Sequence, residues 1–473
     1  MLFNTGRFAL FFLIVFLANW LLGKRFRAQN VVLVLASQWF YACWDYRFLA
    51  LLWFSMLVDY VVAMRLDASS NERQRKWLIT LSVSVQLGIL GLFKYLNFFA
   101  DSGAALLQRL GFGVHPIALG IVLPVGISFY TFQTMSYTID VYRRVIPAER
   151  NLLSFATFVS LFPQLVAGPI ERARRILPQI NAPRSLPPEA LYSGATLILF
   201  GLYKKVFIAD NLATVVDRAF SEPEALTRPE AILALYAFAF QIYGDFSGYT
   251  DIARGTARLL GFDFALNFRR PYFARNPSDF WQRWHISLSS WLRDYLYIPL
   301  GGNKRGTGRT LLNLFLTMLL GGLWHGASWT FVLWGAYHGL LLVVHRLLKP
   351  VLNRVQPKNV VASGLWAALR CVVMFHLVAL GWLPFRAHKL LEVKQVLLGI
   401  LQRGGSFAEA AGSAKWLCAC AGLLLLLELA EELKPDFLAR RQFWARGLVY
   451  AAVLLSILIA GAPGGQTFIY FQF

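Results

Sequence analysis

The sequence contains few charged side chains. Asp, Glu, Lys and Arg make up only 15% of its 473 residues, while hydrophobic residues make up 57%. A soluble domain normally carries about 25% charged residues. A single buried core also could not hold apolar segments that recur along nearly the whole chain. The scarcity of charge therefore excludes a water-soluble globular protein and indicates an integral membrane protein.

Acidic residues and cysteines are also few. Asp and Glu number 25 against 46 Lys and Arg, which gives a formal net charge of +21. Because the basic residues lie in loops between apolar segments, the positive-inside rule and contact with membrane lipid explain the excess, and no nucleic-acid partner is predicted. The 4 cysteines show neither disulfide nor zinc spacing, and no histidine pattern suits a metal, so we predict no metal site.

Several familiar catalytic motifs are missing. The sequence has no G-x-S-x-G elbow, Walker loop or H-E-x-x-H motif. The pattern of soluble acyltransferases, a histidine followed five residues later by aspartate, is absent at His325. Motifs of this kind therefore predict no more than a membrane protein with a buried histidine site.

Apolar segments dominate what is present. Each approaches the roughly 20 residues that cross about 30 Å of hydrocarbon as a helix, and the alternation of an outer-membrane barrel is absent. We predict an all-α, polytopic bundle of about 10 to 13 spans, with re-entrant and interfacial helices where Gly and Pro interrupt the segments. One domain is predicted over residues 1–473. The segments are 8–23, 31–44, 48–64, 77–100, 117–138, 152–167, 192–208, 231–249, 311–329, 330–348, 361–383, 415–430 and 448–460.

Basic and nearly neutral loops alternate along the first segments. Lys24 and Arg25 follow the first apolar run, where a cleaved signal peptide would have small residues, so this run is predicted to be a retained span. Loop 65–76 is basic as well, whereas loops 45–47 and 101–115 are nearly neutral. The positive-inside rule then places the basic loops in the cytoplasm and the N-terminus outside.

Three clusters of polar residues interrupt the apolar pattern, and ionisable groups in such places indicate a functional interior or a polar cavity. The first, 241–255, holds Asp251 and Arg254 together with several tyrosines. On a helix, Gly244 and Gly248 would form a face of small residues that permits close helix approach. We favour a structural interpretation of this cluster, an ion pair such as Asp251 with Arg254, over direct chemistry.

The second cluster, 269–302, contains five arginines and three tryptophans. It is too polar to span and too aromatic for an ordinary loop, so an amphipathic segment at the cytoplasmic interface is predicted. Within it, His285 and Ser289 would share a helical face. The arginines could form a belt that binds headgroups or could hold an anionic donor, and both interpretations stay open.

The third cluster, 321–339, places His325 in an apolar segment between glycines and tryptophans. A lone buried histidine is more often a hydrogen-bonded core residue than a catalyst. This setting is less ordinary, and a near-neutral pKa would suit proton abstraction from a hydroxyl. His338 follows 13 positions later, on roughly the opposite face of a continuous helix, which argues against a metal pair.

Five stretches in and around these clusters resemble the membrane-bound O-acyltransferase family, in particular its bacterial branch that acetylates polysaccharides. The likeness covers nearly the whole chain, and the last two stretches are long enough to be highly specific. The terminal residues 468–473 give a weaker signal for the same branch. The stretches are FYTFQTMSY (129–137), FPQLVAGPI (162–170), YGDFSGYTD (243–251), DFWQRWHISLSSWLRDY (279–295) and LWHGASW (323–329).

The resemblance implies a helical bundle around a central funnel or tunnel in a bacterial inner membrane, with a catalytic histidine that matches His325. The second polar position of the family matches His285, which would position a substrate or stabilise the oxyanion. The resemblance further implies acetyl-CoA or another cytoplasmic acyl thioester as donor, no tightly bound cofactor, and a periplasmic acetyltransferase partner that completes transfer to the polysaccharide. Candidates for binding donor or acceptor are Trp324, Ser328, Trp329, Tyr243, Asp245, Ser289, Arg283, Arg293 and Asp294.

Three other functions remain open at this stage. The D-alanyl or teichoic-acid arm of the same family also transfers acyl groups outward. A transporter of polymer or lipid-linked sugar would move its substrate without making new ester bonds. A scaffold would leave all chemistry to its partner, and His325 would then matter only for assembly.

Overall fold

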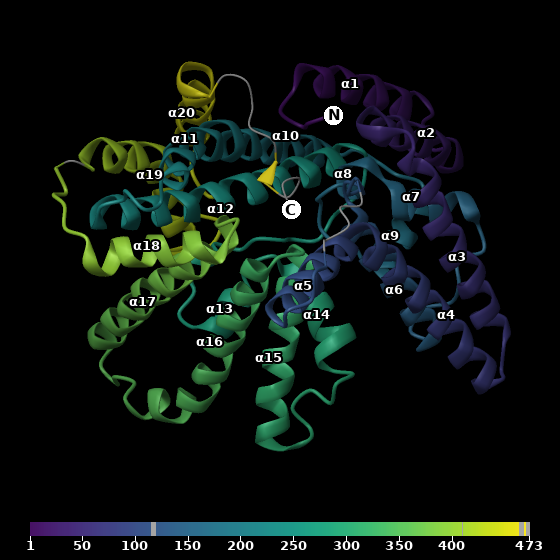
Figure 1. Cartoon of the computed structure of the whole chain (residues 1–473). Coiled ribbons are helices and arrows are strands. Elements are labelled where there is room, and N and C mark those ends of the chain that lie inside the picture. The colour runs from purple at the N-terminus through teal and green to yellow at the C-terminus, as the bar shows by residue number, and fades with distance from the viewer. Residues whose placement is uncertain (115–119, 409, 463–467, 470–473) are drawn as a thin grey trace. The chain divides into compact units, whose positions relative to one another are not determined.

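The structure, a computed structural model, describes residues 1–114, 120–408, 410–462 and 468–469, and it divides into two compact units (Figure 1). The first comprises Met1–Ile198 and Ala253–Ala265, and the second comprises Leu199–Ile252 and Leu266–Phe473. No strand occurs among the described residues. The single domain predicted over the whole chain stays a prediction, and each unit is described by itself.

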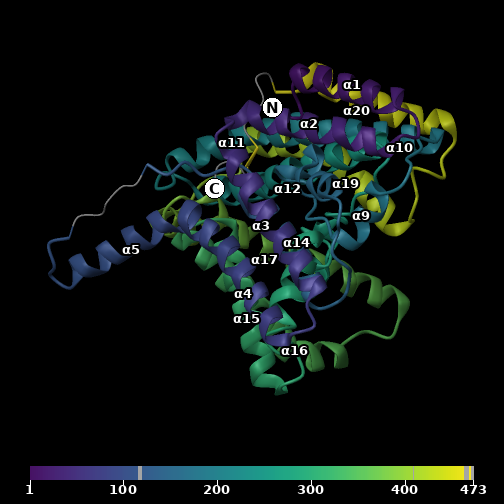
Figure 2. The ribbon, with the colours of Figure 1, turned by 90° about the vertical axis from the view of Figure 1, so that its right-hand side faces the viewer.

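The first unit is built from helices that begin at capping side chains. Asn71 accepts hydrogen bonds from two backbone N–H groups of α4, and Asn151 does the same for α7. Figure 2 shows α3 and α4 as neighbours, and the carboxylate of Asp59 in α3 accepts hydrogen bonds from Ser82 (2.6 Å) and Gln86 (2.9 Å) of α4. The helices are α1 Gly6–Leu21, α2 Phe26–Asp45, α3 Phe48–Ala68, α4 Glu72–Leu90, η1 Gly91–Tyr95, α5 Leu96–Arg109, α6 Ile127–Tyr142, α7 Leu152–Ser160, α8 Phe162–Leu165, α9 Ala173–Ile180 and most of α10 Pro188–Leu202.

Two predicted segments of this unit are interrupted, as their Gly and Pro residues indicated. Segment 152–167 divides at Leu161 into α7 and α8, and the 9 residues of α7 are too few to cross a bilayer. Segment 117–138 is helical only from Ile127, and its first residues, 117–119, lie outside the described residues.

The second unit contains the two longer polar clusters and the longest apolar helices. Its first residues, from Leu199, are the last turn of α10. The last residues of α12, from Ala253, belong to the first unit. The elements are η2 Tyr203–Ala209, α11 Asp210–Ser221, α12 Arg228–Leu259, η3 Pro271–Phe273, α13 Pro277–Trp281, α14 Ile286–Leu292, η4 Arg293–Tyr297, α15 Gly306–His325, α16 Trp329–Arg354, α17 Val360–Arg386, α18 Leu390–Gln402, α19 Ala411–Leu433 and α20 Phe443–Ala460.

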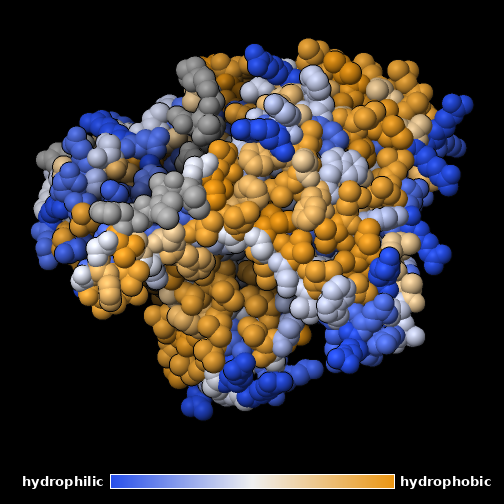
Figure 3. Space-filling view, turned by 45° about the vertical axis from the view of Figure 1, so that its right-hand side comes forward, coloured by the Kyte–Doolittle hydropathy of each residue, from blue (hydrophilic) through white to orange (hydrophobic). Residues whose placement is uncertain are grey.

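Seven helical stretches of the described chain are long and apolar enough to cross a membrane, and hydrophobic side chains cover much of the face in Figure 3. Many of these side chains are exposed, which is costly in water and expected in lipid. The all-α, polytopic class is confirmed, while the number of 10 to 13 spans and the funnel stay predictions. The stretches are Phe48–Ala68, Glu72–Arg109, Pro188–Ser221, Trp329–Arg354, Val360–Arg386, Ala411–Leu433 and Phe443–Ala460.

The small-residue face predicted on α12 is confirmed. A Cβ atom added to Gly244 would lie 2.8 Å from the carbonyl oxygen of Lys204, and one added to Gly248 would lie 2.7 Å from that of Gly201. Such separations leave no room for a side chain, so the two glycines let the backbone of α12 pack directly on the preceding helix.

The helix predicted over residues 311–329 ends earlier than expected, at His325. Gly326 has an extended backbone (φ −160°, ψ 150°), and the Ser328 side chain caps α16 by accepting a hydrogen bond from the N–H of Thr330. Helices α15 and α16 therefore form a hairpin (Figure 1). A Cβ atom on Gly335 of α16 would lie 2.6 Å from the carbonyl oxygen of Met318 in α15, so close packing requires glycine.

Candidate active site

The structure brings the two predicted catalytic histidines together within the second unit. His325 is the last residue of α15 and is 4% exposed, and His285 immediately precedes α14 and is fully buried. Their ring centroids lie 6.3 Å apart. Forty sequence positions separate the two residues. Their approach therefore depends on how the turn before α14 packs against the end of α15.

The turn at His285 is anchored by Asn267, a buried residue that the sequence analysis missed. The carbonyl oxygen of Asn267 accepts the N–H of Ile286 (2.9 Å), and its side-chain oxygen accepts the hydroxyl of Ser287 (2.9 Å). His285 itself has a left-handed backbone (φ 44°, ψ 54°). No motif signals Asn267, because its partners lie about 20 residues away.

The predicted helical face shared by His285 and Ser289 is therefore wrong. His285 lies before the helix, and the Ser289 hydroxyl turns back to donate to the carbonyl oxygen of Trp284 at 3.1 Å. The N–H of Ser289 donates to the carbonyl oxygen of His285 at 2.9 Å, the first bond of the helix.

Aromatic rings enclose both histidines. The ring of Trp324 lies 5.0 Å from His325 and 5.9 Å from His285. Trp334 of α16 and Phe385 of α17 meet His325 edge to face at 4.8 and 5.3 Å. The sequence analysis missed Phe385, and Trp334 was only part of the quoted cluster. A surrounding of this kind has low polarity, so each charge or dipole inside it acts strongly.

Burial lowers the pKa of His285 from 6.5 to about 3. The unfolded chain takes up a proton below about pH 6.5, whereas the folded protein does not until about pH 3, so acidification through this window favours unfolding. Between pH 7 and pH 5 the loss amounts to about 2 kcal/mol. We expect a His285→Gln variant to lack this part of the loss when unfolding is measured in detergent at both pH values. Equal losses in the two proteins would contradict it.

The third cluster contributes Trp324 and Trp334 to the surroundings of the histidine pair, besides His325 itself. Ser328 caps α16, and its hydroxyl shares a 2.6 Å hydrogen bond with that of Thr330. Trp329 is 55% exposed. The glycines beside His325 serve helix packing, since Phe331 of α16 occupies the space next to Gly326.

The polar atoms of Tyr243 and Asp245 are engaged by other protein groups. The Tyr243 hydroxyl donates to the carboxylate of Glu428 in α19. Asp245 pairs with Lys205 at 2.7 Å and accepts the N–H of Ile469 at 2.7 Å. This arrangement agrees with the structural interpretation of the first cluster, although Asp251 is paired with Lys204 (2.8 Å).

Two arginines of the second cluster are paired with one carboxylate of α19. Arg283 contacts Glu432 at 3.0 Å and also Asp279 at 2.7 Å, and Arg270 contacts Glu432 at 2.8 Å. Arg293, whose side chain is 64% exposed, pairs with its neighbour Asp294 at 2.8 Å. These contacts favour a structural role for Arg270 and Arg283. In the described part of the chain, no group of three or more His, Cys, Asp or Glu side chains is arranged to hold a metal ion.

Comparison with known proteins identifies the family of this chain. The model of the membrane-bound O-acyltransferase family matches residues 142–380, which include His285 and His325. The chain belongs to this family. It is therefore a multi-pass membrane protein and an O-acyltransferase, and the resemblance seen in its motifs is confirmed.

Individual relatives of this acyltransferase align over most of its length. A protein of Pseudomonas putida named "probable alginate O-acetylase" is 41% identical over 100% of both chains. One of the same name from Azotobacter vinelandii is 45% identical over 82% of this chain and 76% of its own. A "peptidoglycan O-acetyltransferase" of Helicobacter pylori is 36% identical over 86% of this chain and 80% of its own.

Proposed function

We propose that this acyltransferase moves acetyl groups from a cytoplasmic thioester, acetyl-CoA, across a bacterial inner membrane for O-acetylation of an extracytoplasmic polysaccharide. The observation that carries the proposal is the buried His285–His325 pair inside the region that matches the family. Relatives named for acetylation of alginate and of peptidoglycan support acetyl as the acyl group and a polysaccharide as the acceptor.

In the proposed mechanism, His325 acts as general base. Its imidazole removes the proton from an acceptor hydroxyl, whose oxygen attacks the thioester carbonyl. The new C–O bond forms, the C–S bond breaks, and the thiolate leaves with the proton that His325 carried. His285 stays neutral because of its lowered pKa, so one of its ring nitrogens carries a proton that can be donated to the oxyanion.

The remaining parts of the proposal concern the direction in which the acetyl group crosses the membrane. Basic loops on the cytoplasmic face would place the N-terminus in the periplasm. A periplasmic acetyltransferase would then receive the acetyl group and complete transfer to the polymer. The acceptor hydroxyl at His325 would in that case belong to a carrier or to the partner and not to the polymer itself.

Direction and donor can be tested together in membrane vesicles from cells that make the polymer. We expect labelled acetyl-CoA, which does not cross membranes, to give base-labile acetate esters in inverted vesicles and not in right-side-out ones. Vesicles lacking this chain should give none in either orientation. Equal labelling in both orientations would contradict the cytoplasmic donor, and D-alanyl esters in place of acetate would favour the teichoic-acid type of transfer.

A further inference from the structure

The segment that leads to His285 forms a loop whose two ends lie side by side. At the base of the loop, the N–H of Ile286 donates to the carbonyl oxygen of Asn267 at 2.9 Å. Further into the loop, the N–H of Arg269 donates to the carbonyl oxygen of Arg283, also at 2.9 Å. His285 lies between these two bonds, so the position of its ring depends on how firmly the ends of the loop are held together.

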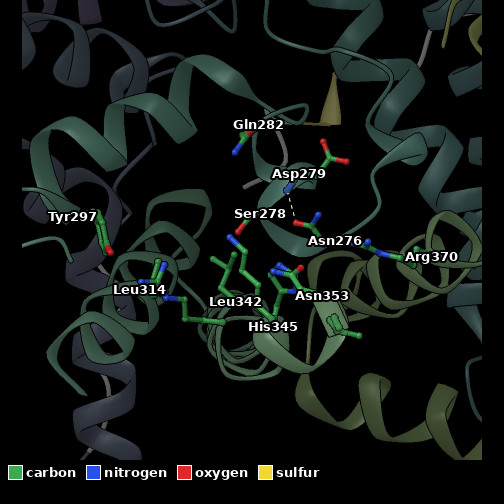
Figure 4. A pocket seen from close by; sticks show the side chains of 13 residues that line it. Asn276, Ser278, Asp279, Gln282, Tyr297, Leu314, Leu342, His345, Asn353 and Arg370 are labelled. Carbon is green, nitrogen blue, oxygen red and sulfur yellow. Dashed lines mark hydrogen bonds between the residues drawn. The ribbon is translucent and has the colours of Figure 1, made fainter. Parts of the chain in front are cut away.

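Within the loop, one carboxylate holds the outgoing end. Asp279 lies in α13, which begins after Asn276, whose side chain accepts the N–H of Asp279 at 2.9 Å (Figure 4). One carboxylate oxygen of Asp279 accepts the Nε–H of Arg283 at 2.7 Å, and the other accepts the N–H of Arg275 at 2.9 Å. These bonds fix the middle of the loop to its outgoing end and leave the two terminal nitrogens of Arg283 for a second carboxylate.

The second carboxylate, that of Glu432, comes from α19 and bridges both ends of the loop. Its two oxygens accept hydrogen bonds from the two terminal nitrogens of Arg283, each at 3.0 Å, and Oε2 also accepts the Nε–H of Arg270 at 2.8 Å. Arg270 belongs to the incoming end of the loop and Arg283 to the outgoing end. The three side chains are only 16 to 23% exposed, so these charge-assisted bonds are stronger than those of a surface pair.

Each end of the loop also contains a residue with a strained backbone. Arg270 and His285 are both left-handed, with φ 45° and φ 44°. Such a backbone is uncommon for residues other than glycine, and it persists only where the surrounding structure holds it in place. Glu432 binds the side chain of Arg270 and that of Arg283, two positions before His285, and is therefore placed to hold both strained positions.

The preceding turn of α19 reaches the same loop through Tyr243. The carboxylate of Glu428 accepts the hydroxyl of Tyr243, whose ring lies 6.1 Å from that of Trp284, the residue before His285. Glu428 and Glu432 are four positions apart and thus share one face of α19. This face of α19 meets the loop through Tyr243 at one turn and directly at the next.

We propose that Glu432 is a positioning residue for His285: by binding Arg270 and Arg283 together, it holds the imidazole where it can act on the acyl group. The assignment rests on the proposed function, in which His285 donates a hydrogen bond to the oxyanion. Such a donor works only within hydrogen-bonding distance of the developing charge, and a misplacement of about 1 Å can lower a rate about 10²-fold. Without the carboxylate, the two guanidinium groups would repel each other and the ends of the loop would separate.

The test is a double-mutant cycle between Glu432→Gln and His285→Ala, with acetyl transfer measured in inverted vesicles at matched protein levels. His285→Ala should lower kcat about 10²- to 10³-fold, the usual effect of losing an oxyanion donor. We expect Glu432→Gln to lower kcat about 10-fold in the parent chain, with the KM for acetyl-CoA within about twofold. When residue 285 is already alanine, Glu432→Gln should change kcat less than about twofold, because residues that act through one another are not additive.

The matched control is Glu431→Gln, which removes the same charge from the neighbouring position of α19. The carboxylate of Glu431 accepts the N–H of Leu438 at 2.9 Å. No hydrogen bond or ion pair joins it to the loop among the residues that the structure describes. The kcat of Glu431→Gln should therefore stay within about twofold of the parent value.

The outcomes distinguish this proposal from the proposed function. If His285→Ala transfers as fast as the parent chain, the role given to His285 in the proposed function fails, and the positioning role of Glu432 fails with it. If His285→Ala is slow and Glu432→Gln is as fast as the parent, only the positioning role fails. An equal loss of kcat from Glu432→Gln in both backgrounds would also overturn it, because the carboxylate would then act independently of His285.

Two further arms keep the cycle decisive. If Glu432→Gln does not accumulate in the membrane, Glu432→Asp takes its place with the same expectations, since it keeps the charge and shortens the side chain by one methylene group. If the parent transfers D-alanyl in place of acetyl groups, the acetyl donor of the proposed function is wrong, and the same cycle is measured with the D-alanyl substrate.

Discussion

Replacing His325 by alanine is expected to lower the rate of acetyl transfer about 10²- to 10⁴-fold, the usual contribution of a general base. The ring lies within 6.3 Å of His285 and is enclosed by Trp324, Trp334 and Phe385. His325 is only 4% exposed, so solvent has little access with which to replace the imidazole as proton acceptor. The measurement is ester-linked acetate, released by mild base from the secreted polymer, with rates taken in vesicles at matched protein levels.

Two controls distinguish a catalytic role of His325 from a role in assembly of the protein. His388 is exposed, and its ring contacts Arg386 and none of the residues described around His325. His388→Ala should therefore leave transfer unchanged. Added imidazole should restore part of the activity of His325→Ala, because the cavity left by the ring can admit it. Full activity of His325→Ala, correctly inserted and equally abundant, would remove this residue from the mechanism.

A Lys205→Met variant is expected to lose about 3 to 5 kcal/mol of stability. The ammonium group of Lys205 is buried between the carboxylates of Asp210 (2.8 Å) and Asp245 (2.7 Å). Without it, two buried carboxylates face each other with no cation between them. The readouts are the midpoint of thermal unfolding in detergent and the abundance in membranes, which responds several-fold to changes of this size.

The matched control removes a cation from an exposed pair. Arg47→Met breaks its contact with Asp45 and should change neither readout, since exposed ion pairs contribute little. Adding Asp210→Asn and Asp245→Asn to Lys205→Met should restore most of the stability. If the triple variant is stable and still transfers acetyl groups, Asp245 has a structural role; if it is stable and inactive, at least one of the three buried side chains is needed for transfer.

The sequence predicted the class of fold, and it singled out the two histidines whose rings the structure places 6.3 Å apart. The geometry that brings them together could not be predicted from it. Apolar segments indicate helices because, in lipid, the backbone N–H and C=O groups must form their hydrogen bonds within the segment. The approach of His285 to His325 depends on a left-handed backbone at His285 and on Asn267, which no periodicity encodes. The pair was predicted from a resemblance to a family and not from spacing.

The arginines of the second cluster show the opposite failure. Their sequence suggested a belt that binds headgroups or a site for an anionic donor, yet Arg270 and Arg283 are paired with Glu432, about 150 positions away. Which cations keep a carboxylate partner is a property of tertiary packing alone.

The aromatic enclosure of His325 also bears on a competing reaction. A base that activates a hydroxyl activates water equally well, and water attacking the thioester would release free acetate and waste the donor. Under the proposed mechanism, burial of the imidazole by Trp324, Trp334 and Phe385 would reserve the acetyl group for a hydroxyl that can enter the enclosure. Under that mechanism, the rings would favour transfer of the acetyl group over hydrolysis of the thioester.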